Sequence, residues 1–325
     1  MKDKCVIGVD IGGTHMRCAL MDRKGTVLAF RKDRSRSDEG PEALTRRLVQ
    51  QCRDLLADGG LSNARLGAVG LGVAGKLDTA SGTILFSPNL PSLAGFPLAV
   101  RVQEALQVPV AMENDANVFG LGEAWLGKAR NVSNWIGVTL GTGVGGCFFA
   151  NGRLWQGDRL GFSGEIGHMI VDPQGPECAC GQKGCLEAHA SATALVQGVR
   201  QAQKEAVPLS DLLQEALRRD QLTAHTIYRA ARGGDPVARR LFARMGWALA
   251  VALSNLFTFL GISTAVIGGG VSASWDQFAP AMLDYFQQVP SMLDPQSIHV
   301  HRTELEDRAS IYGAASLAWQ TVDRR

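Results

Sequence analysis

One histidine and three cysteines lie within eighteen residues of this chain, in the order His168, Cys178, Cys180 and Cys185. Zn²⁺ favours four nitrogen and sulfur ligands in a tetrahedron, and three cysteines with one histidine form a common structural set. Two glycines between Cys180 and Cys185 let the chain turn tightly enough for both sulfurs to face one ion. The spacing therefore predicts a structural zinc site. A disulfide or a group of free buried thiols is the alternative, although three cysteines cannot all pair with one another.

Two glycine-rich turns follow short apolar runs. The stretch Ile7-Gly-Val-Asp-Ile-Gly-Gly-Thr14 aligns without gaps on Ile136-Gly-Val-Thr-Leu-Gly-Thr-Gly143. Each combines an apolar strand, a turn and a second apolar strand, so we expect two related β-hairpins, one per domain, facing a common cleft. Chance similarity between two glycine-rich hairpins is the alternative.

These turns indicate a phosphate-bearing ligand. Successive backbone N–H groups in a glycine-rich turn form a concavity that binds anions, and the missing Cβ atoms let phosphate oxygens approach closely. Neither turn is a Walker P-loop, because no Gly-Lys-Ser/Thr follows the glycines. Asp10 is placed to hold Mg²⁺ through water. The sequence predicts an ATP site from these residues together with the glycines after a third strand: Asp10, Gly12, Gly13, Thr14, Gly141, Thr142, Gly143, Gly269 and Gly270.

Asp115 lies where a strand is expected to end and a helix to begin. A carboxylate there could take the proton of a hydroxyl group that attacks a phosphate. The alternative is an ordinary helix N-cap, a position that Asp and Asn often fill. Several other polar side chains also stand next to turns, and amides and carboxylates of this kind suit the hydroxyls of a sugar: Asn89, Asn114, Glu165, His168 and Glu187. We therefore predict a sugar site with Asp115 as general base.

Strand and helix patterns alternate along the chain, which predicts an α/β fold that positions these residues. Apolar runs predict strands at 5–9, 16–21, 66–73, 108–112, 134–139 and 264–267. Helical spacing predicts helices at 41–56 and 116–125, and mostly helix from 191 to 260. The stretch 245–275 lacks charged residues and is long enough to span a membrane, but polar residues and glycines interrupt it. A buried helix at 247–260 that precedes a buried strand explains it better.

Composition argues against nucleic-acid and membrane partners. The net charge is only +2 over 325 residues, and the densest basic cluster, Arg31 to Arg36, reads as a solvated loop rather than a binding patch. The first ten residues do not form a signal peptide, and seven cysteines without an export signal fit a reducing cytoplasm. We expect a cytoplasmic protein.

Five segments together resemble the signatures of the ROK family, which comprises repressors, open-reading-frame proteins and sugar kinases within the actin-like ATPase superfamily. They are Asp10–Thr14, Glu113–Asn117, Leu140–Gly146, Gly164–His168 and Cys178–Glu187. The resemblance extends from residue 5 to about residue 318. It implies two RNase H-like domains with a cleft between them. We expect an N-terminal domain at 1–118, to which a C-terminal helix at 308–325 returns, and a C-terminal domain at 119–307 that carries the zinc loop.

The resemblance also assigns roles to residues. It implies that Asp115 is the catalytic base, that Asn89, Asn114, Glu165, His168 and Glu187 bind the sugar, and that His168 and the three cysteines bind zinc. In the stretch 256–262, where relatives often have Asn-Pro, this chain reads Leu-Phe-Thr-Phe-Leu-Gly-Ile, which puts the local helix end in doubt.

The expected activity is transfer of the γ-phosphate of ATP to the 6-hydroxyl of glucose. The same residues would serve a kinase for mannose, fructose, allose or N-acetylmannosamine. A sugar-responsive repressor is a further alternative, but such members carry a helix-turn-helix domain ahead of the first phosphate turn, for which Asp10 leaves no room. The family also implies a homodimer or homotetramer.

Overall fold

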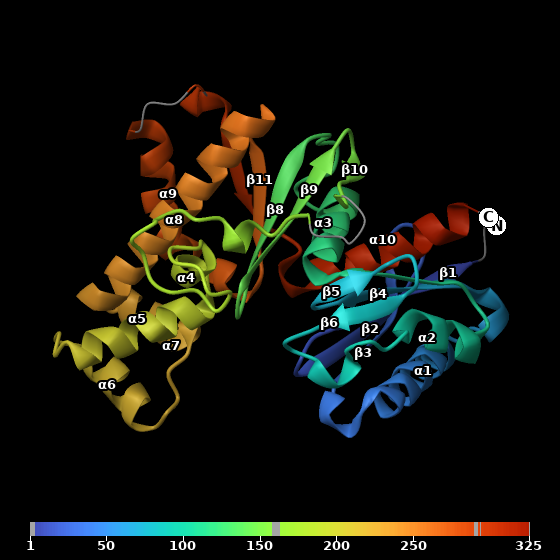
Figure 1. The fold of residues 1–325 in the computed structure, drawn as a ribbon. Coiled ribbons are helices and arrows are strands. Elements are labelled where there is room, and N and C mark those ends of the chain that lie inside the picture. The colour runs from blue at the N-terminus through green and yellow to red at the C-terminus, as the bar shows by residue number, and fades with distance from the viewer. Residues whose placement is uncertain (1–3, 158–162, 289–291, 293, 325) are drawn as a thin grey trace. The chain divides into compact units, whose positions relative to one another are not determined.

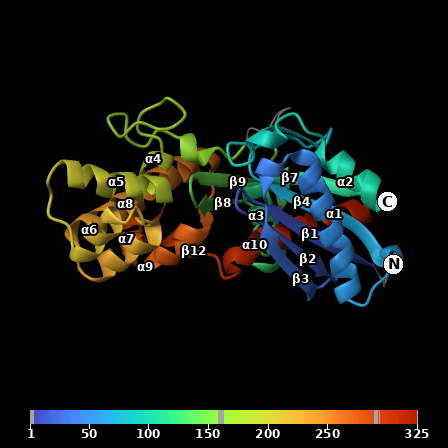
Figure 2. The same ribbon diagram turned by 90° about the horizontal axis from the view of Figure 1, so that it is seen from below.

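The computed structural model describes residues 4–157, 163–288, 292 and 294–324. They fall into two compact units, the first drawn from Met1–Ser133, Cys147–Ser163 and Thr303–Arg325, and the second from Asn134–Gly146 and Gly164–Arg302. Each unit contains a mixed sheet with helices (Figures 1 and 2). The α/β class expected from the alternating pattern is confirmed.

The first unit is built on a five-stranded sheet with the order β3-β2-β1-β4-β7. Its strands are β1 (Cys5–Ile11), β2 (His15–Met21), β3 (Val27–Arg34), β4 (Leu66–Val73) and β7 (Val110–Asn114). The first three are antiparallel neighbours, whereas β4 and β7 run parallel to β1. A small second sheet pairs β5 (Lys76–Asp78) with β6 (Thr83–Phe86). The central strand β1 is buried along its whole length, which explains its nearly continuous apolar sequence.

Helices cover both faces of this sheet. On one face lie α1 (Pro41–Asp58) and α2 (Leu98–Leu106), and on the other lies α10 (Ala309–Asp323), which packs against β1, β4 and α3 (Asp115–Leu126) (Figure 1). The α10 contacts are made at backbone distance. A Cβ atom on Gly313 would lie 1.6 Å from the carbonyl oxygen of Val118, and one on Gly70 would lie 1.9 Å from that of Ala314. The glycines are therefore what allows α10 to sit directly on the sheet.

Replacing Gly313 by alanine should destabilise the first unit by about 3 kcal/mol, since overfilling a packed core usually costs about 1–3 kcal/mol and the neighbour here is rigid backbone. Urea unfolding of the full chain measures this loss. Gly233→Ala is the matched control, because Gly233 has a helical φ of −75° and its Cβ would meet only ordinary contacts at 3.4 Å. Equal stability of the two variants would contradict the backbone contact between α10 and α3.

A second five-stranded sheet resembles the first. It has the order β10-β9-β8-β11-β12, with β8 (Trp135–Leu140), β9 (Val144–Ala150), β10 (Arg153–Leu154), β11 (Thr264–Gly268) and β12 (His299–Arg302). Strands β8, β11 and β12 belong to the second unit, whereas β10 and the part of β9 from Cys147 onward are grouped with the first. As in the first sheet, two strands run parallel to the strand that enters the glycine-rich turn. The two similar segments are thus equivalent hairpins, as their alignment predicts.

The described residues of the second unit form the α-helices α4 (Glu187–Ala190), α5 (Ala192–Lys204), α6 (Asp211–Arg218), α7 (Ala224–Arg232), α8 (Pro236–Leu260) and α9 (Trp275–Gln288). The long helix α8 has the length and hydropathy of a membrane span, and half of its most apolar window is buried. Its side chains Phe242, Leu249 and Phe257 are fully buried. The helix therefore serves as a core helix of this unit, as the sequence predicts for its second half, and it begins eleven residues earlier than expected.

Two expectations need revision. The basic cluster from Arg31 to Arg36 is not a solvated loop, because β3 continues to Arg34. The strand escaped detection because it lies at the edge of the sheet and most of its residues are exposed, which removes the apolar alternation.

The helix end at 256–262 is regular. Gly261 adopts a left-handed φ of 65° and its N–H donates to the carbonyl of Phe257, which is a common way to end a helix.

The two compact units are groups of residues in contact with one another, which is not the same as domains that fold independently. The domain boundary expected at residue 118 therefore stays a prediction. In the structure α3 extends past this residue to Leu126 and lies wholly in the first unit, because it packs on α10.

Candidate active site

The turn between β1 and β2 is shaped to present backbone N–H groups. The N–H of Gly12 donates to the carbonyl of His15 across the turn. Ser35 holds two further carbonyls, since its hydroxyl donates to Gly12 and its N–H donates to Thr14. In the described part of the chain, no acceptor lies within hydrogen-bonding distance of the N–H groups of Gly13 and Thr14, and both residues are exposed. Two neighbouring donors are thus available to an anion.

The equivalent turn in the second unit, Gly141–Gly143, is held by the same kinds of hydrogen bond. The N–H of Gly141 donates to Gly143 across the turn, and the carbonyls of Gly141 and Thr142 accept from Ala192 and Thr193. The N–H groups of Thr142 and Gly143 have no acceptor among the described residues. The candidate nucleotide residues therefore form two similar anion-binding turns, one in each unit.

The third glycine segment follows β11. Gly269 has a φ of 83°, and a Cβ atom there would lie 2.4 Å from the carbonyl oxygen of Leu140, at the end of β8. Gly270 begins a short 3-10 helix (Gly270–Ser274), and a Cβ atom on it would meet nothing within 4 Å. The segment thus lies beside the strand that leads into the second turn, with open space above Gly270.

Asp10 lies at the base of the first turn and is nearly buried. Its carboxylate accepts two hydrogen bonds from the guanidinium of Arg17, at 3.0 and 2.5 Å, and Arg17 also bonds to Asp307. Burial raises the pKa of the Asp10 carboxyl, and the charge of Arg17 opposes this effect. A pocket of about 260 Å³ opens here, lined by Asp10, Gly12, Thr14, His15, Arg17 and Lys32. Arg17 did not emerge from the sequence, although the hairpin register places it directly opposite Asp10.

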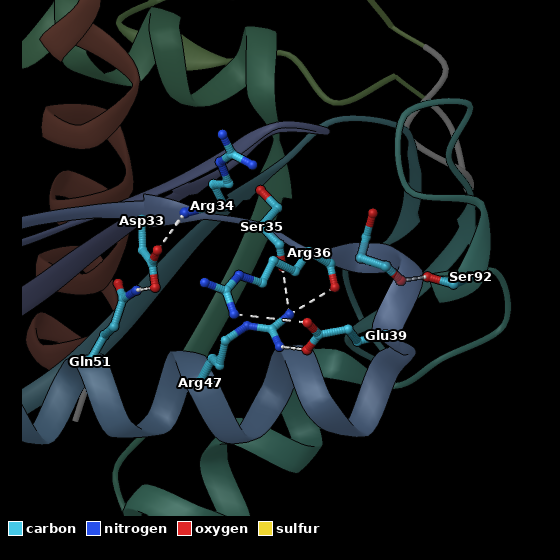
Figure 3. Close-up of polar contacts among 9 residues, drawn as sticks. Asp33, Arg34, Ser35, Arg36, Glu39, Arg47, Gln51 and Ser92 are labelled. Atoms are coloured by element: carbon cyan, nitrogen blue, oxygen red, sulfur yellow. Dashed lines mark hydrogen bonds and ion pairs between the residues drawn. The ribbon is translucent and has the colours of Figure 1, made fainter.

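A network around Arg47 on α1 fixes the segment that holds the first turn (Figure 3). The guanidinium of Arg47 donates to the carbonyls of Ser35 and Arg36 at 2.7 and 2.8 Å, and it forms an ion pair with Glu39. Ser92 donates to the carbonyl of Ser37 at 2.5 Å. The network ties the segment after β3 both to α1 and to the loop that carries Asn89.

Arg47→Met should loosen this segment and cost about 1–3 kcal/mol of unfolding free energy, because two partly buried carbonyls lose a charged donor. Hydrogen exchange of the Ser35 amide, which donates to Thr14, should accelerate as well. Arg46→Met is the matched control, since Arg46 is exposed on the same helix. If both variants exchanged at the wild-type rate, the network would not be what holds the turn.

Asn89 belongs to an exposed loop that contacts the first turn. A Cβ atom on Gly13 would lie 3.0 Å from the carbonyl oxygen of Asn89, so the two backbones are in close contact. The loop is anchored by Ser87, whose hydroxyl donates to the carbonyl of Ala74 at 2.6 Å. The next residue, Gly75, accepts a hydrogen bond from the side chain of Asn114. The structure therefore groups Asn89 and Asn114 with the Gly12–Thr14 turn of the same unit.

Asp115 is the first residue of α3, and Asn114 is the N-cap, with its side-chain oxygen accepting from Ala116 at 2.9 Å. The N–H of Ala116 also donates to the Asp115 carboxylate at 3.0 Å, so Asp115 shares the capping contact that the sequence offered as its alternative role. Glu113, which is buried, accepts from the N–H of Asn114 and from the side chains of Asn117 and Gln156. Its part in fixing the strand-to-helix junction was missed, because a buried carboxylate is recognisable only from its partners.

The four predicted metal ligands converge in the second unit. One donor atom from each of His168, Cys178, Cys180 and Cys185 lies within 4.8 Å of every other. The sulfurs of Cys180 and Cys185 lie 3.7 Å apart, and the sulfur of Cys178 lies 3.8 Å from Nδ1 of His168. Tetrahedral Zn²⁺ with Zn–S bonds of about 2.3 Å would place two sulfurs about 3.8 Å apart. All four cysteine and histidine side chains therefore fit one ion, and the cysteines are unpaired.

The glycines of this loop adopt the conformations that the sequence argument requires. Gly181 and Gly184 have φ values of 90° and 74°. A Cβ atom on Gly184 would lie only 1.6 Å from the carbonyl oxygen of Asp172. The loop can close around its cysteines only with glycine at these positions.

Glu165 and Glu187 flank the cluster on different elements. Glu165 is exposed and precedes the short 3-10 helix Ile166–His168. Glu187 begins α4, and its carboxylate accepts from the N–H of Val144 at 2.9 Å. A Cβ atom on Gly143 would lie 2.4 Å from that carboxylate. Glu187 thus links the cysteine loop to the Gly141–Gly143 turn.

The candidate residues fall into two sets. The first unit holds Asp10, Gly12, Gly13, Thr14, Asn89, Asn114 and Asp115, and the second holds Gly141, Thr142, Gly143, Glu165, His168, Glu187, Gly269, Gly270 and the three cysteines. Each set is coherent within its own unit, and each contains one anion-binding turn together with polar groups suited to hydroxyls.

Comparison with known proteins agrees with this arrangement. The model of the ROK family matches residues 6–321. The chain belongs to the ROK family. It is 34% identical to a glucokinase from Thermotoga maritima, with 98% of each chain covered. It also resembles the crystal structure of a ROK family glucokinase from Streptomyces griseus in complex with glucose and AMPPNP, with a TM-score of 0.78, 31% identity, and 97% and 99% of the two chains covered.

Regulators are also among the relatives. A xylose repressor from Caldicellulosiruptor bescii is 28% identical over 96% of this chain and 77% of its own length. Family membership therefore establishes the actin-like ATPase fold, whereas the choice between catalysis and regulation depends on the site.

Proposed function

We propose that the protein is an ATP-dependent kinase that phosphorylates glucose at its 6-hydroxyl. The observation that carries the proposal is the pair of equivalent turns, each with two adjacent N–H groups available to an anion, in units that also hold the sugar-binding candidates. A glucokinase relative at 34% identity and a similar structure that holds glucose and AMPPNP support it.

In the proposed reaction, Asp115 accepts the proton of the sugar hydroxyl as the hydroxyl oxygen attacks the γ-phosphorus of ATP, and ADP leaves. Asn89, Asn114, Glu165, His168 and Glu187 would bind the remaining hydroxyls. The N–H groups of the two turns would stabilise the charge of the transferred phosphoryl group. Mg²⁺, held through water by Asp10, would neutralise part of the phosphate charge.

The side chain of Asn114 already makes two hydrogen bonds within the protein, one through its oxygen and one through its nitrogen. Its remaining lone pair and N–H can still reach a hydroxyl. The amide would therefore hold the sugar while it fixes the start of α3, directly beside the proposed base.

Asp115→Asn should reduce turnover by at least about 10²-fold and leave sugar affinity nearly unchanged, because the amide keeps the shape of the side chain but cannot accept the proton. Steady-state kinetics and sugar binding by calorimetry measure the two quantities. Asp211→Asn is the control, since Asp211 is also the first residue of a helix after its N-cap. Near-normal turnover of the Asp115 variant would remove it from the role of base.

We further propose that the Cys₃His cluster binds zinc as a structural ion. Its donor atoms have the type and spacing for tetrahedral Zn²⁺. The ion would fix the loop from which His168 and Glu187 extend, so it supports the sugar site without taking part in the reaction.

Cys180→Ser should lose zinc and sugar affinity together, because the loop that carries both sets of residues would lose its fourth ligand. Elemental analysis gives the zinc content, and calorimetry gives the affinity for glucose. Lys183→Ala changes an exposed residue of the same loop and should retain both. A zinc-free variant with normal affinity for glucose would show that the metal and the sugar site are independent.

A sugar-responsive regulator is the second candidate, favoured by the xylose repressor relative. ADP release with glucose, mannose, fructose, allose and N-acetylmannosamine separates the candidates. Turnover led by glucose supports the proposal, and turnover led by another sugar keeps the mechanism but changes the substrate. No turnover by zinc-replete protein would favour the regulator. We also propose a cytoplasmic homodimer or homotetramer without nucleic-acid or membrane partners.

A further inference from the structure

The hydrogen bonds of the buried Glu113 carboxylate join three segments of the first unit. Glu113 lies near the end of β7, directly before Asn114 and the proposed base Asp115. Its Oε1 atom accepts from the N–H of Asn114 at 2.8 Å and from the side chain of Asn117 on α3 at 3.0 Å. Its Oε2 atom accepts from the side chain of Gln156 at 2.5 Å. The carboxylate therefore connects β7, α3 and the segment after β10.

Gln156 reaches Glu113 from a segment whose backbone is anchored just before it. The N–H of Trp155 donates to the carbonyl of Phe148 on β9 at 2.8 Å, and the carbonyl of Trp155 accepts from the hydroxyl of Ser163 at 2.6 Å. Gln156 itself is exposed and lies 43 residues from Glu113 in the sequence. The bond thus ties the junction of β7 and α3 to a distant segment that the sheet holds in place.

The contact with the N–H of Asn114 fixes the peptide group directly before the proposed base. This N–H belongs to the planar peptide between Glu113 and Asn114, so holding it holds the whole peptide plane. Asn114 is the N-cap of α3 and Asp115 is its first residue, so the direction of this peptide sets how the chain enters the helix. Gln156 keeps the Glu113 carboxylate from turning away from the N–H, and through it acts on Asp115.

Stability of the strand-to-helix junction is the simplest other explanation of this network. The network is a costly way to obtain it, because all three donors to the buried carboxylate are neutral groups. The side-chain oxygen of Asn117 is also buried without a hydrogen-bond partner among the described residues. Costs of this kind are typical of residues that serve a functional site.

We propose that Gln156 is a positioning residue for phosphoryl transfer, which acts through Glu113 on the direction of Asp115. The inference rests on the proposed kinase function and on Asp115 as the base. The side chain of Asn114 is held separately by two hydrogen bonds of its own, so loss of Gln156 should disturb the base more than the sugar contact. A displacement of about 1 Å at a reacting group can lower turnover by about 10²-fold.

Gln156→Met removes the donor and keeps an unbranched side chain. It should lower kcat for the best sugar about tenfold and change the dissociation constant of that sugar, measured by calorimetry, by less than about threefold. Gln201→Met is the matched control, since Gln201 is also exposed and donates to the carboxylate of Glu205 at 2.7 Å. Its kcat should stay within about twofold of the wild type. A Gln156 variant with wild-type kcat, or with a loss confined to sugar affinity, would overturn the proposal.

Substitutions of Glu113 test whether Gln156 acts through it. Glu113→Met should lower kcat at least about tenfold, and adding Gln156→Met should lower it no further, because both changes break the same link. Glu113→Gln should recover most of the turnover that Glu113→Met loses, since its amide oxygen can still accept from Asn114 and the Gln156 amide can turn to accept. Losses that multiply in the double variant, or a Glu113→Gln variant as slow as Glu113→Met, would contradict the proposal. Gln156→Met changes an exposed residue and decides the matter if Glu113→Met does not fold.

Two further readouts separate the possible outcomes. If the network served stability alone, Gln156→Met would unfold at a lower urea concentration, while its folded fraction would keep the wild-type kcat. Hydrogen exchange of the Asn114 amide requires no turnover, and it should accelerate in Gln156→Met but not in Gln201→Met. Unchanged exchange would contradict the link between Gln156 and this peptide, whereas a wild-type protein that phosphorylates no sugar would contradict the proposed function.

Discussion

The candidate site depends on hydrogen bonds that the protein donates to the backbone carbonyls of its two glycine-rich turns. In each glycine-rich turn, the protein's own donors hold carbonyl oxygens: Ser35 holds those of Gly12 and Thr14 in the first unit, and Ala192 and Thr193 hold those of Gly141 and Thr142 in the second. A peptide group cannot rotate its carbonyl without rotating the N–H of the next residue, so these bonds also fix the N–H groups of Gly13, Thr142 and Gly143. The turns proposed to bind phosphate are therefore held in shape by the protein itself, and fixed backbone dipoles stabilise developing charge most effectively.

The surroundings of each turn explain why its supports come from distant parts of the chain. Ser35 is held by Arg47 on α1, and the Asn89 loop contacts the first turn through its backbone (Figure 3). In the second unit, Glu187 connects the second turn to the loop of the Cys₃His cluster. In both units, groups suited to hydroxyls are thus attached to the turn that would hold the phosphates. A shift of these groups would therefore also move the turn to which they are attached.

The charged side chains around the Gly12–Thr14 turn differ in how deeply they are buried and in whether they have a partner of opposite charge. Asp10 is nearly buried and bound to Arg17, whereas Lys32 and Arg34 on β3 are exposed and have no acidic partner among the described residues. Arg31 on the same strand forms ion pairs with Asp54 and Asp58. A buried carboxylate that keeps a single cation is suited to hold a metal through water, whereas exposed and unbalanced cations attract mobile anions. The two kinds of group lie side by side at the Gly12–Thr14 turn.

The sequence by itself determined the parts that depend on local patterns. The strand from Leu66 to Val73, the two equivalent hairpins and the four clustered metal ligands follow from apolar runs, glycine placement and short spacing, and the structure agrees with them. Only the tertiary structure revealed the partners of Asp10, the buried role of Glu113, and the strand character of the Arg31–Arg34 segment. These features depend on which residues meet across a sheet or between a loop and a helix. An exposed edge strand carries no apolar period, and a single charged residue carries no signal of its partner, so one-dimensional spacing cannot supply them.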